Sequence, residues 1–320
     1  MERRFLLGMP VALGLALLLS LFPLIVPIYW VMLATEILIM GLFAMSFNLL
    51  FGYAGLLSFG HGGFLGVGAY VTALFLIHGS WSLWFILLAS ILSASLAAFL
   101  VGFLCVRRDE IFFAMLSLAL GMMLFAVAHN WREVTGGSDG LPVFAVPPLS
   151  LGLWKLSLFA PSSMYYFTLF WFATSALFLW TVVRSPFGLM LQAVRENKLR
   201  LSFSGTDVRL VRLAAFVIAG GLAGLAGFLL CLFNRMAAPD MLHWSFSARP
   251  VLMTILGGAG TFWGPAVGSA IFFILEHWVT AFTENWMIVL GSLLILVVLF
   301  FPDGIWGTLS KATGERKEQV

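Results

Sequence analysis

Runs of about 20 consecutive, mostly apolar residues dominate the sequence, and each is long enough to cross a hydrocarbon core as a helix. Hydrophobic residues make up 62% of the 320 positions and charged residues 10%, whereas soluble domains hold about 45–50% apolar residues. Water is therefore not the main solvent of this chain. The runs lie near residues 11–29, 31–50, 62–78, 84–105, 111–129, 164–183, 213–233, 250–276 and 286–301.

These runs predict an all-α fold, a polytopic bundle of membrane helices with about eight to ten membrane elements. We expect one transmembrane domain over residues 1–310 and a short cytoplasmic tail over 311–320. The first run follows a basic start, as in a signal peptide, but it lacks a small-residue cleavage site and is predicted to be retained. Cys105 and Cys231 lie in apolar runs, where a thiol behaves as a small hydrophobe, so they indicate neither a disulfide nor a metal site.

The basic residues are concentrated in four regions of the chain. Thirteen of the 17 are Arg3, Arg4, Arg107, Arg108, Arg184, Arg195, Lys198, Arg200, Arg209, Arg212, Lys311, Arg316 and Lys317. Because Lys and Arg accumulate in cytoplasmic loops, these regions and both termini are predicted to lie on the cytoplasmic side of a bacterial inner membrane, with 130–163 and 235–249 outside. This orientation requires an even number of crossings. Since 250–301 does not divide into one or three ordinary helices, we expect a broken or re-entrant element there.

Two glycine-rich stretches interrupt the apolar sequence, at residues 51–70 and 256–268. They are too rich in glycine for a stable uninterrupted helix, and irregular backbone at membrane depth is tolerated only inside protein or beside a watery cavity. Both contain a Gly-x-Ala-Gly sequence, which is a weak sign of repeated halves. The candidates for a translocation pathway or a broken helix are Asn48, Gly52, Gly55, Ser58, His61, Gly257, Gly258 and Gly260.

Each of these residues also has a purely structural interpretation. The glycines can simply let helices approach closely, as the spacing of Gly220, Gly224 and Gly227 also suggests, and the polar side chains can hold helices together. His61 is a functional candidate because ionisable groups at membrane depth are rare. A neutral imidazole bonded to a neighbouring carbonyl is nevertheless the favoured interpretation.

A short amphipathic helix is predicted over residues 189–197, after the Pro-Phe-Gly at 186–188. Such a helix between two spanning helices can dock into a groove on a soluble partner. It can also lie on anionic lipid headgroups, which attract each basic residue by about 1 kcal/mol. Its apolar face is formed by residues at helical spacing: Leu189, Met190, Ala193 and Val194.

Five segments carry a family resemblance. They are MSFNLLFGYAGLLSFGHGGFLGVGAYV at 45–71, TGGSDGL at 135–141, SPFGLMLQAVRENKLRLSFSGTDV at 185–208, AAFVIAGGLAGLAG at 214–227 and VLMTILGGAGTFWGPAVGSA at 251–270. In content and order they resemble the LivM/LivH permeases of branched-chain amino acid ABC importers. The long loop with TGGSDGL is more similar to the LivM branch, and urea and short-amide importers have very similar permeases.

The resemblance implies a permease subunit that imports branched-chain amino acids (leucine, isoleucine, valine) or related small amino acids or amides. Its implied partners are a second homologous, LivH-like permease, two cytoplasmic ABC ATPase subunits and a periplasmic substrate-binding protein. The chain departs from the family pattern at Leu189 and at Ser202–Ser204. The implied ATPase-coupling loop contains Gln192, Ala193, Arg195, Glu196, Asn197 and Gly205.

The TGGSDGL segment contributes three further candidates, Gly136, Gly137 and Asp139. Glycines of this kind provide turns, and the aspartate adds a carboxylate. The segment is a candidate contact for the binding protein, and a self-capped turn is the structural alternative.

The sequence contains no GxxxxGK[ST] phosphate loop. We therefore expect no enzyme activity in this chain, no bound cofactor or metal, and use of ATP by partner subunits; membrane lipid surrounds it and nucleic acid is not an expected partner. The alternative function is an ion-coupled secondary transporter or channel with His61, Glu36 or Glu276 as the titrating group, but these groups are few and scattered. A membrane enzyme has the least support, because no cluster has catalytic or metal-ligand spacing.

Overall fold

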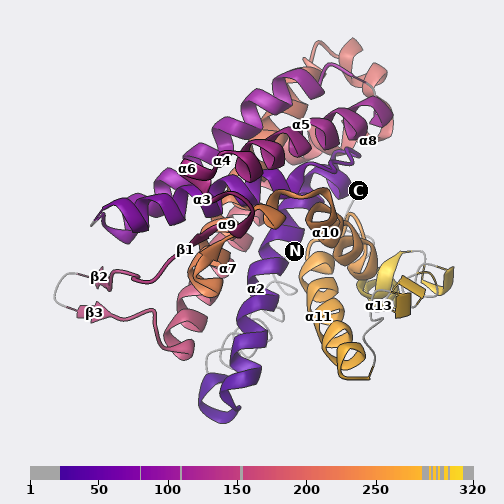
Figure 1. Cartoon of the computed structure of the whole chain (residues 1–320). Helices are drawn as coiled ribbons and strands as arrows, with labels where there is room; N and C mark the ends of the chain where they lie inside the picture. Colours follow the sequence, from indigo (N-terminus) through magenta and orange to yellow (C-terminus); the bar gives the residue numbers. More distant parts are fainter. Residues whose placement is uncertain are drawn as a thin grey trace.

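The computed structural model describes residues 22–79, 81–108, 110–151, 154–282, 288–289, 291–292, 295, 299–301 and 303–312. Helices account for most of them (Figure 1). The longer ones are α2 (Ile28–Asn48), α3 (His61–His78), α4 (Leu83–Cys105), α5 (Glu110–Asn130), α7 (Pro161–Arg184), α8 (Pro186–Phe203), α9 (Val208–Asn234), α10 (Trp244–Gly257), α11 (Gly264–Phe282) and α13 (Gly304–Ala312). A π-helical turn, η1 (Leu49–Tyr53), extends α2.

Short elements connect several of these helices. Between α5 and α7 lie α6 (Arg132–Thr135), the 3-10 turn η2 (Gly137–Asp139) and three strands, and between α9 and α10 lie a strand and the 3-10 turn η3 (Pro239–Leu242). Strand β1 (Leu141–Pro142) pairs antiparallel with β4 (Met236–Ala237). Strands β2 (Leu149–Leu151) and β3 (Trp154–Leu156) form a separate hairpin.

Six helical stretches are long and apolar enough to cross a membrane within the described residues: Ile28–Tyr53, His61–His78, Leu83–Cys105, Ile111–Asn130, Pro161–Arg184 and Val208–Asn234. The predicted fold class, an all-α polytopic bundle, is confirmed. The run at 250–276 is divided between α10 and α11, so the predicted broken element is confirmed as well. The predicted runs at 11–29 and 286–301 lie mostly outside the described residues, and the division at residue 310 stays a prediction.

Helix α9 forms the centre of the bundle and packs closely against α3 and α4. A Cβ atom at Gly68 would lie 2.7 Å from the Gly224 Cα, and one at Gly227 would lie 3.0 Å from the Ala69 nitrogen. The Ser90 hydroxyl of α4 donates to the carbonyls of both Gly68 (3.0 Å) and Gly224 (3.1 Å). Small residues and a shared hydroxyl therefore bring three helices together, as is usual in membrane bundles.

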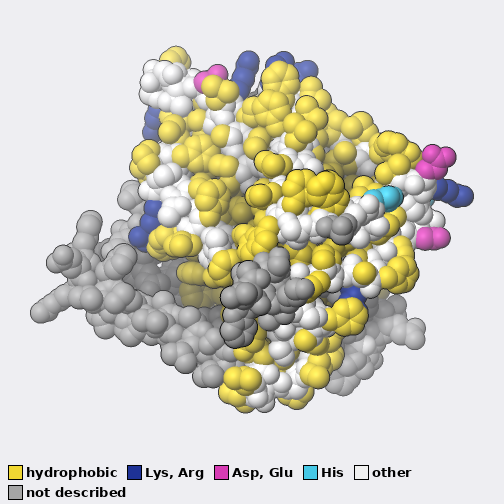
Figure 2. All heavy atoms as spheres, turned by 90° about the vertical axis from the view of Figure 1, so that its left-hand side faces the viewer, with side chains coloured by type: hydrophobic (Ala, Val, Ile, Leu, Met, Phe, Trp, Pro, Cys, Tyr) yellow, Lys and Arg dark blue, Asp and Glu magenta, His cyan; other side chains and the backbone are white. Residues whose placement is uncertain are grey.

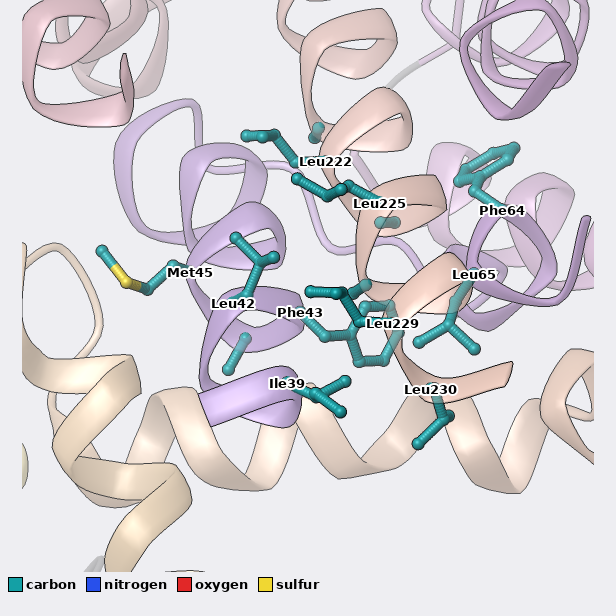
Figure 3. Packing of buried hydrophobic residues seen from close by; sticks show 14 of the residues in the cluster. Ile39, Leu42, Phe43, Met45, Phe64, Leu65, Leu222, Leu225, Leu229 and Leu230 are labelled. Atoms are coloured by element: carbon teal, nitrogen blue, oxygen red, sulfur yellow. The ribbon is translucent and has the colours of Figure 1, made fainter. Parts of the chain in front are cut away.

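One hydrophobic core connects most of the described helices, and Figure 3 shows the part of it between α2, α3 and α9. Ile39, Leu42 and Phe43 of α2 are buried against the side of α9 that carries Leu225 and Leu229. Lipid tails are as apolar as leucine, so this burial gives the helices close van der Waals packing rather than a hydrophobic driving force.

The surface is also apolar over large areas. Figure 2 shows a face that is largely hydrophobic, with its Lys and Arg side chains mainly toward the edges. Helix α4 exposes Leu88, Leu92, Leu96 and Phe99 along its length. A stripe of this size marks a contact surface, and with six candidate spans it identifies a multi-pass membrane protein whose outer face is suited to lipid.

Candidate functional site

The first glycine-rich break is shorter than the sequence predicted. The helix of α2 continues through η1 to Tyr53, residues 54–60 leave the helical conformation, and α3 begins at His61. Of the glycine-rich stretch at 51–70, only residues 54–60 interrupt the helices: 51–53 belong to η1, and 61–70 belong to α3, in agreement with the predicted run at 62–78. Glycine has poor helix propensity, but here its small size permits the close contacts of α3 with α5 and α9, and this packing decides the conformation.

The second break turns the chain between α10 and α11, over residues 258–263. Gly258 (φ +117°) and Gly260 (φ +81°) take backbone conformations that favour glycine. Helix α10 has 14 residues and is about 21 Å long, less than the roughly 30 Å of a hydrocarbon core. It is a half-length helix whose backbone at Gly257 packs on that of α11, since a Cβ there would lie 3.0 Å from the Gly268 nitrogen.

Asn48 joins the two breaks. Its Nδ2 donates to the Thr261 carbonyl at 2.9 Å, and its Oδ1 accepts from the Gly260 nitrogen at 3.1 Å. The side chain is buried, and both ends of its amide are engaged. Gly52, one turn further along, is packed so closely that a Cβ there would lie 2.5 Å from the Gly260 nitrogen. The pathway role predicted for Asn48 stays a prediction. Its two hydrogen bonds give it a structural role, because they join the end of α2 to the α10–α11 turn.

His61 is fully buried at the start of α3, among the rings of Phe43, Phe47 and Phe64. Its Nε2 lies 2.9 Å from the Ser46 hydroxyl, which itself donates to the Phe43 carbonyl at 2.7 Å. Because that hydroxyl has only one proton, His61 must donate from Nε2. The expected carbonyl partner of His61 is thus wrong: a serine hydroxyl stands between the imidazole and the carbonyl.

Two buried polar atoms next to this pair have no hydrogen-bond partner in the described part of the chain. They are the Nδ1 of His61 and the hydroxyl of Ser58, which lies inside the first break. Buried polar groups are generally satisfied by protein or by ordered water.

Helix α8 contains the predicted amphipathic helix and a kink. It begins at Pro186, and Asn197 interrupts it with extended backbone (φ −161°, ψ 98°). The Asn197 Oδ1 accepts from the nitrogens of Leu199 (3.1 Å) and Arg200 (3.0 Å), so this side chain caps a second helical piece. The buried face consists of Gly188, Leu191 and Val194. Of the predicted apolar face, Val194 is buried and Leu189 is 61% exposed, because the bundle-facing residues recur every three positions from Gly188.

Arg195 connects α8 to both breaks. Its Nη1 donates to the Gly52 carbonyl. A Cβ at Gly55 would lie 3.1 Å from the Arg195 Cγ, and one at Gly260 would lie 3.1 Å from the Arg195 Nη1. Glu196 is exposed beside it. The predicted coupling loop is far in sequence from the predicted pathway residues. Through Arg195, the two regions meet at one junction.

The remaining members of the predicted coupling loop are spread along this segment. Gln192 and Ala193 are half-buried on α8, and Gly205 (φ +85°) lies in the exposed turn between α8 and α9. Their predicted contact with an ATPase stays a prediction.

The TGGSDGL segment forms consecutive turns against the α9–α10 connection. Gly136 and Gly137 have positive φ angles, and the exposed Asp139 accepts a hydrogen bond from Ser138 (3.2 Å). A Cβ at Gly140 (φ +72°) would lie 3.0 Å from the Ala238 Cα, where β1 pairs with β4. The turn geometry was predicted from the glycines; the pairing with β4 was missed, because two-residue strands leave no periodic signal.

A second group of charged residues lies on α2, α10 and α11. Glu36, Arg249 and Glu276 are half-buried and close enough to interact electrostatically. Nearby, the Tyr29 hydroxyl lies 2.6 Å from the His277 Nδ1 and links α2 to α11. Arg249, predicted to lie outside, belongs to α10 and shares this surface with the two carboxylates. Among the described residues, no group of three or more His, Cys, Asp or Glu side chains is arranged to hold a metal ion.

A bundle of spanning helices with two interrupted segments that meet at a junction is typical of a membrane transporter. The comparisons identify the family: residues 29–298 match the family described as branched-chain amino acid transport system / permease component, and the chain belongs to it. The predicted resemblance to LivM/LivH permeases is confirmed.

Individual relatives belong to both branches. LivM of Escherichia coli (strain K12), a high-affinity branched-chain amino acid transport system permease protein, is 27% identical over 85% of this chain and 68% of its own length. LivH of Salmonella typhimurium is 28% identical over 83% of this chain and 91% of its own length. A probable LivM of Methanocaldococcus jannaschii is 25% identical over 69% of this chain and 68% of its own length. No solved structure matches.

Proposed function

We propose that this chain is the membrane-spanning permease subunit of an ATP-binding-cassette importer for branched-chain amino acids, or for related small amino acids or amides. The family match over residues 29–298 carries this proposal. The junction supports it, because a helix at the predicted cytoplasmic surface is connected through Arg195 to both interrupted segments. In the proposed mechanism, partner ATPases move α8 and thereby the helices that border the pathway.

The ion-coupled alternative is less well supported. A proton-carrying histidine needs access to water and to further titrating groups. His61 is instead enclosed by three phenylalanine rings and bonded to Ser46. The relatives are themselves described as permease proteins of branched-chain amino acid transport systems.

The proposed second permease covers the face formed by α2, α10 and α11. Glu36, Arg249 and Glu276 are only half-buried in the single chain. A charged residue facing lipid at the membrane centre costs about 2.5–3.5 kcal/mol or more, so such residues face protein or a watery cavity. We place the translocation pathway at this face, between this chain and a homologous, LivH-like permease.

The other proposed partners are two cytoplasmic ATPase subunits, which consume the ATP, and a periplasmic substrate-binding protein. The exposed side of α8 is the proposed ATPase contact; it carries Leu199 and Phe203, which is 88% exposed. The TGGSDGL turns are the proposed contact for the binding protein. The proposed location is the bacterial inner membrane with both termini in the cytoplasm, on the basis of the Lys and Arg distribution.

Purification followed by transport assays tests this function. The tagged chain is purified from its native membrane in a mild detergent, the co-purifying chains are identified by mass, and the complex is reconstituted into vesicles with its binding protein. We expect a second permease, two ATPases and ATP-dependent leucine uptake. An ATPase without its phosphate-loop lysine is the matched control and should abolish uptake. A chain that purifies alone and takes up leucine in response to a proton or sodium gradient would refute the proposal.

A further inference from the structure

The Arg195 side chain extends from the exposed surface of α8, and its guanidinium lies beside Gly52 and Gly260. Its Nη1 donates to the Gly52 carbonyl, which belongs to the last turn of the helix formed by α2 and η1. Carbonyls at the end of a helix have no partner further along the helix, and the helix dipole places negative charge there. A guanidinium is well suited to this position, because it supplies both the donor and the positive charge.

Two glycine-containing segments contact the Arg195 side chain, which is otherwise exposed. Gly55 on one side and Gly260 on the other approach the side chain so closely that a Cβ at either residue would lie 3.1 Å from it. Asn48 fixes the distance between the two breaks through its bonds to Thr261 and to Gly260. A displacement of α8 therefore strains or breaks the hydrogen bond between the Arg195 guanidinium and the Gly52 carbonyl.

We infer that Arg195 is a positioning residue that transmits movement of α8 to the junction of the two glycine-rich breaks, rather than a contact for the ATPases. This inference rests on the proposed function. The exposed Leu199 and Phe203 of α8 bind the ATPases, and Arg195 links the same helix to the end of η1 through the Gly52 carbonyl. The bond to Gly52 joins α8 to the end of the helix formed by α2 and η1, which Asn48 joins to the α10–α11 turn. When the bond to Gly52 is lost, ATP hydrolysis continues, but less solute moves per ATP hydrolysed.

The experiment uses the complete transporter in vesicles with its binding protein and compares wild type with R195Q, R195K and the control R209Q. Arg209 is an exposed arginine in the first turn of α9, and its backbone nitrogen donates a hydrogen bond to the Asp207 carboxylate. Three quantities are measured: recovery of the ATPase subunits, the rate of ATP hydrolysis, and leucine taken up per ATP hydrolysed.

We expect R195Q to keep its ATPase subunits and its hydrolysis rate, while uptake per ATP falls about tenfold or more, as expected for loss of a charged hydrogen bond that biases a two-state equilibrium. R195K should retain an intermediate value, because lysine keeps the charge but not the planar fork of donors. R209Q should match wild type. A purely structural role would instead lower hydrolysis and uptake together.

A second variant, G55A, reaches the same junction without removing the charge. Its Cβ presses on the Arg195 Cγ, so uptake per ATP should fall as in R195Q. Where R195Q yields no folded permease in the membrane, G55A and R195K decide the question. Unchanged uptake per ATP in these variants, or loss of the ATPases from R195Q, overturns the inference. If wild type itself shows no ATP-driven uptake, the proposed function has failed instead.

Discussion

Replacing Gly52 with alanine tests whether the two breaks are packed as the structure places them. The added methyl group would overlap the Asn48 Oδ1 and lie 2.5 Å from the Gly260 nitrogen. Neither atom can move without breaking the two hydrogen bonds that Asn48 makes across the junction. Each bond contributes about 0.5–1.5 kcal/mol, and overpacking costs about 1–3 kcal/mol. The expected loss is therefore about 2–6 kcal/mol of unfolding free energy.

The matched control is Gly63→Ala in α3. Its methyl group would meet the Leu124 Cδ1 at 3.2 Å, the end of a flexible side chain, and the Gly121 Cα at 3.7 Å. Alanine also favours a helix by about 1 kcal/mol over glycine, so the change should stay within about 1 kcal/mol of wild type in either direction. Unfolding by a denaturing detergent, followed by tryptophan fluorescence, measures both variants. Equal stability of the two variants would refute the described packing at Gly52.

Three further changes test other parts of the structure. Ser46→Ala leaves the His61 Nε2 unpaired and should cost about 1–3 kcal/mol in the same unfolding assay, with less than additive loss when combined with His61→Phe, as a double-mutant cycle would show. Gly140→Ala places a methyl group against the Ala237 carbonyl at a positive φ angle; it should release β1 from β4 and increase protease cleavage within 130–163, whereas unchanged cleavage would contradict the pairing. Phe203→Ala removes a ring that is 88% exposed; stability should change by less than about 0.5 kcal/mol, while recovery of the ATPases should fall, and full recovery would exclude this ring from the contact.

The long helices could be predicted from sequence because each apolar run is about as long as a membrane is thick. The described helices α3, α4, α5, α7 and α9 begin and end within a few residues of the predicted runs. Helix α10 could not be predicted in this way, because a half-length apolar helix joined to another by a glycine turn reads as one continuous run. The extent of the first break was also unpredictable, since the glycines of α3 have low helix propensity and their packing against α5, α9, α10 and η3 makes them helical.

The connection through Arg195 has no sequence signal, because Arg195 and Gly52 are 143 positions apart. Arg195, Glu196 and Asn197 are consecutive members of the ATPase-coupling loop that the family resemblance implies. The structure separates their roles although all three are exposed: Asn197 caps the second piece of α8, Arg195 donates to the Gly52 carbonyl, and Glu196 projects from the surface. Adjacent residues of a helix point in directions about 100° apart, so only the position of α8 on the bundle decides which of them contacts the bundle.

The balance of forces in this bundle explains how such a junction can be both stable and movable. Lipid gives little hydrophobic drive for helix association, so close glycine contacts and a few hydrogen bonds determine the arrangement. Asn48 and Arg195 supply three of these bonds at the junction, together worth a few kcal/mol. An equilibrium between two arrangements that differ by a few kcal/mol can be shifted by a partner with unequal affinity for them. The residues whose loss should destabilise the junction are therefore the same ones that rearrange in the proposed mechanism, in which partner ATPases move α8.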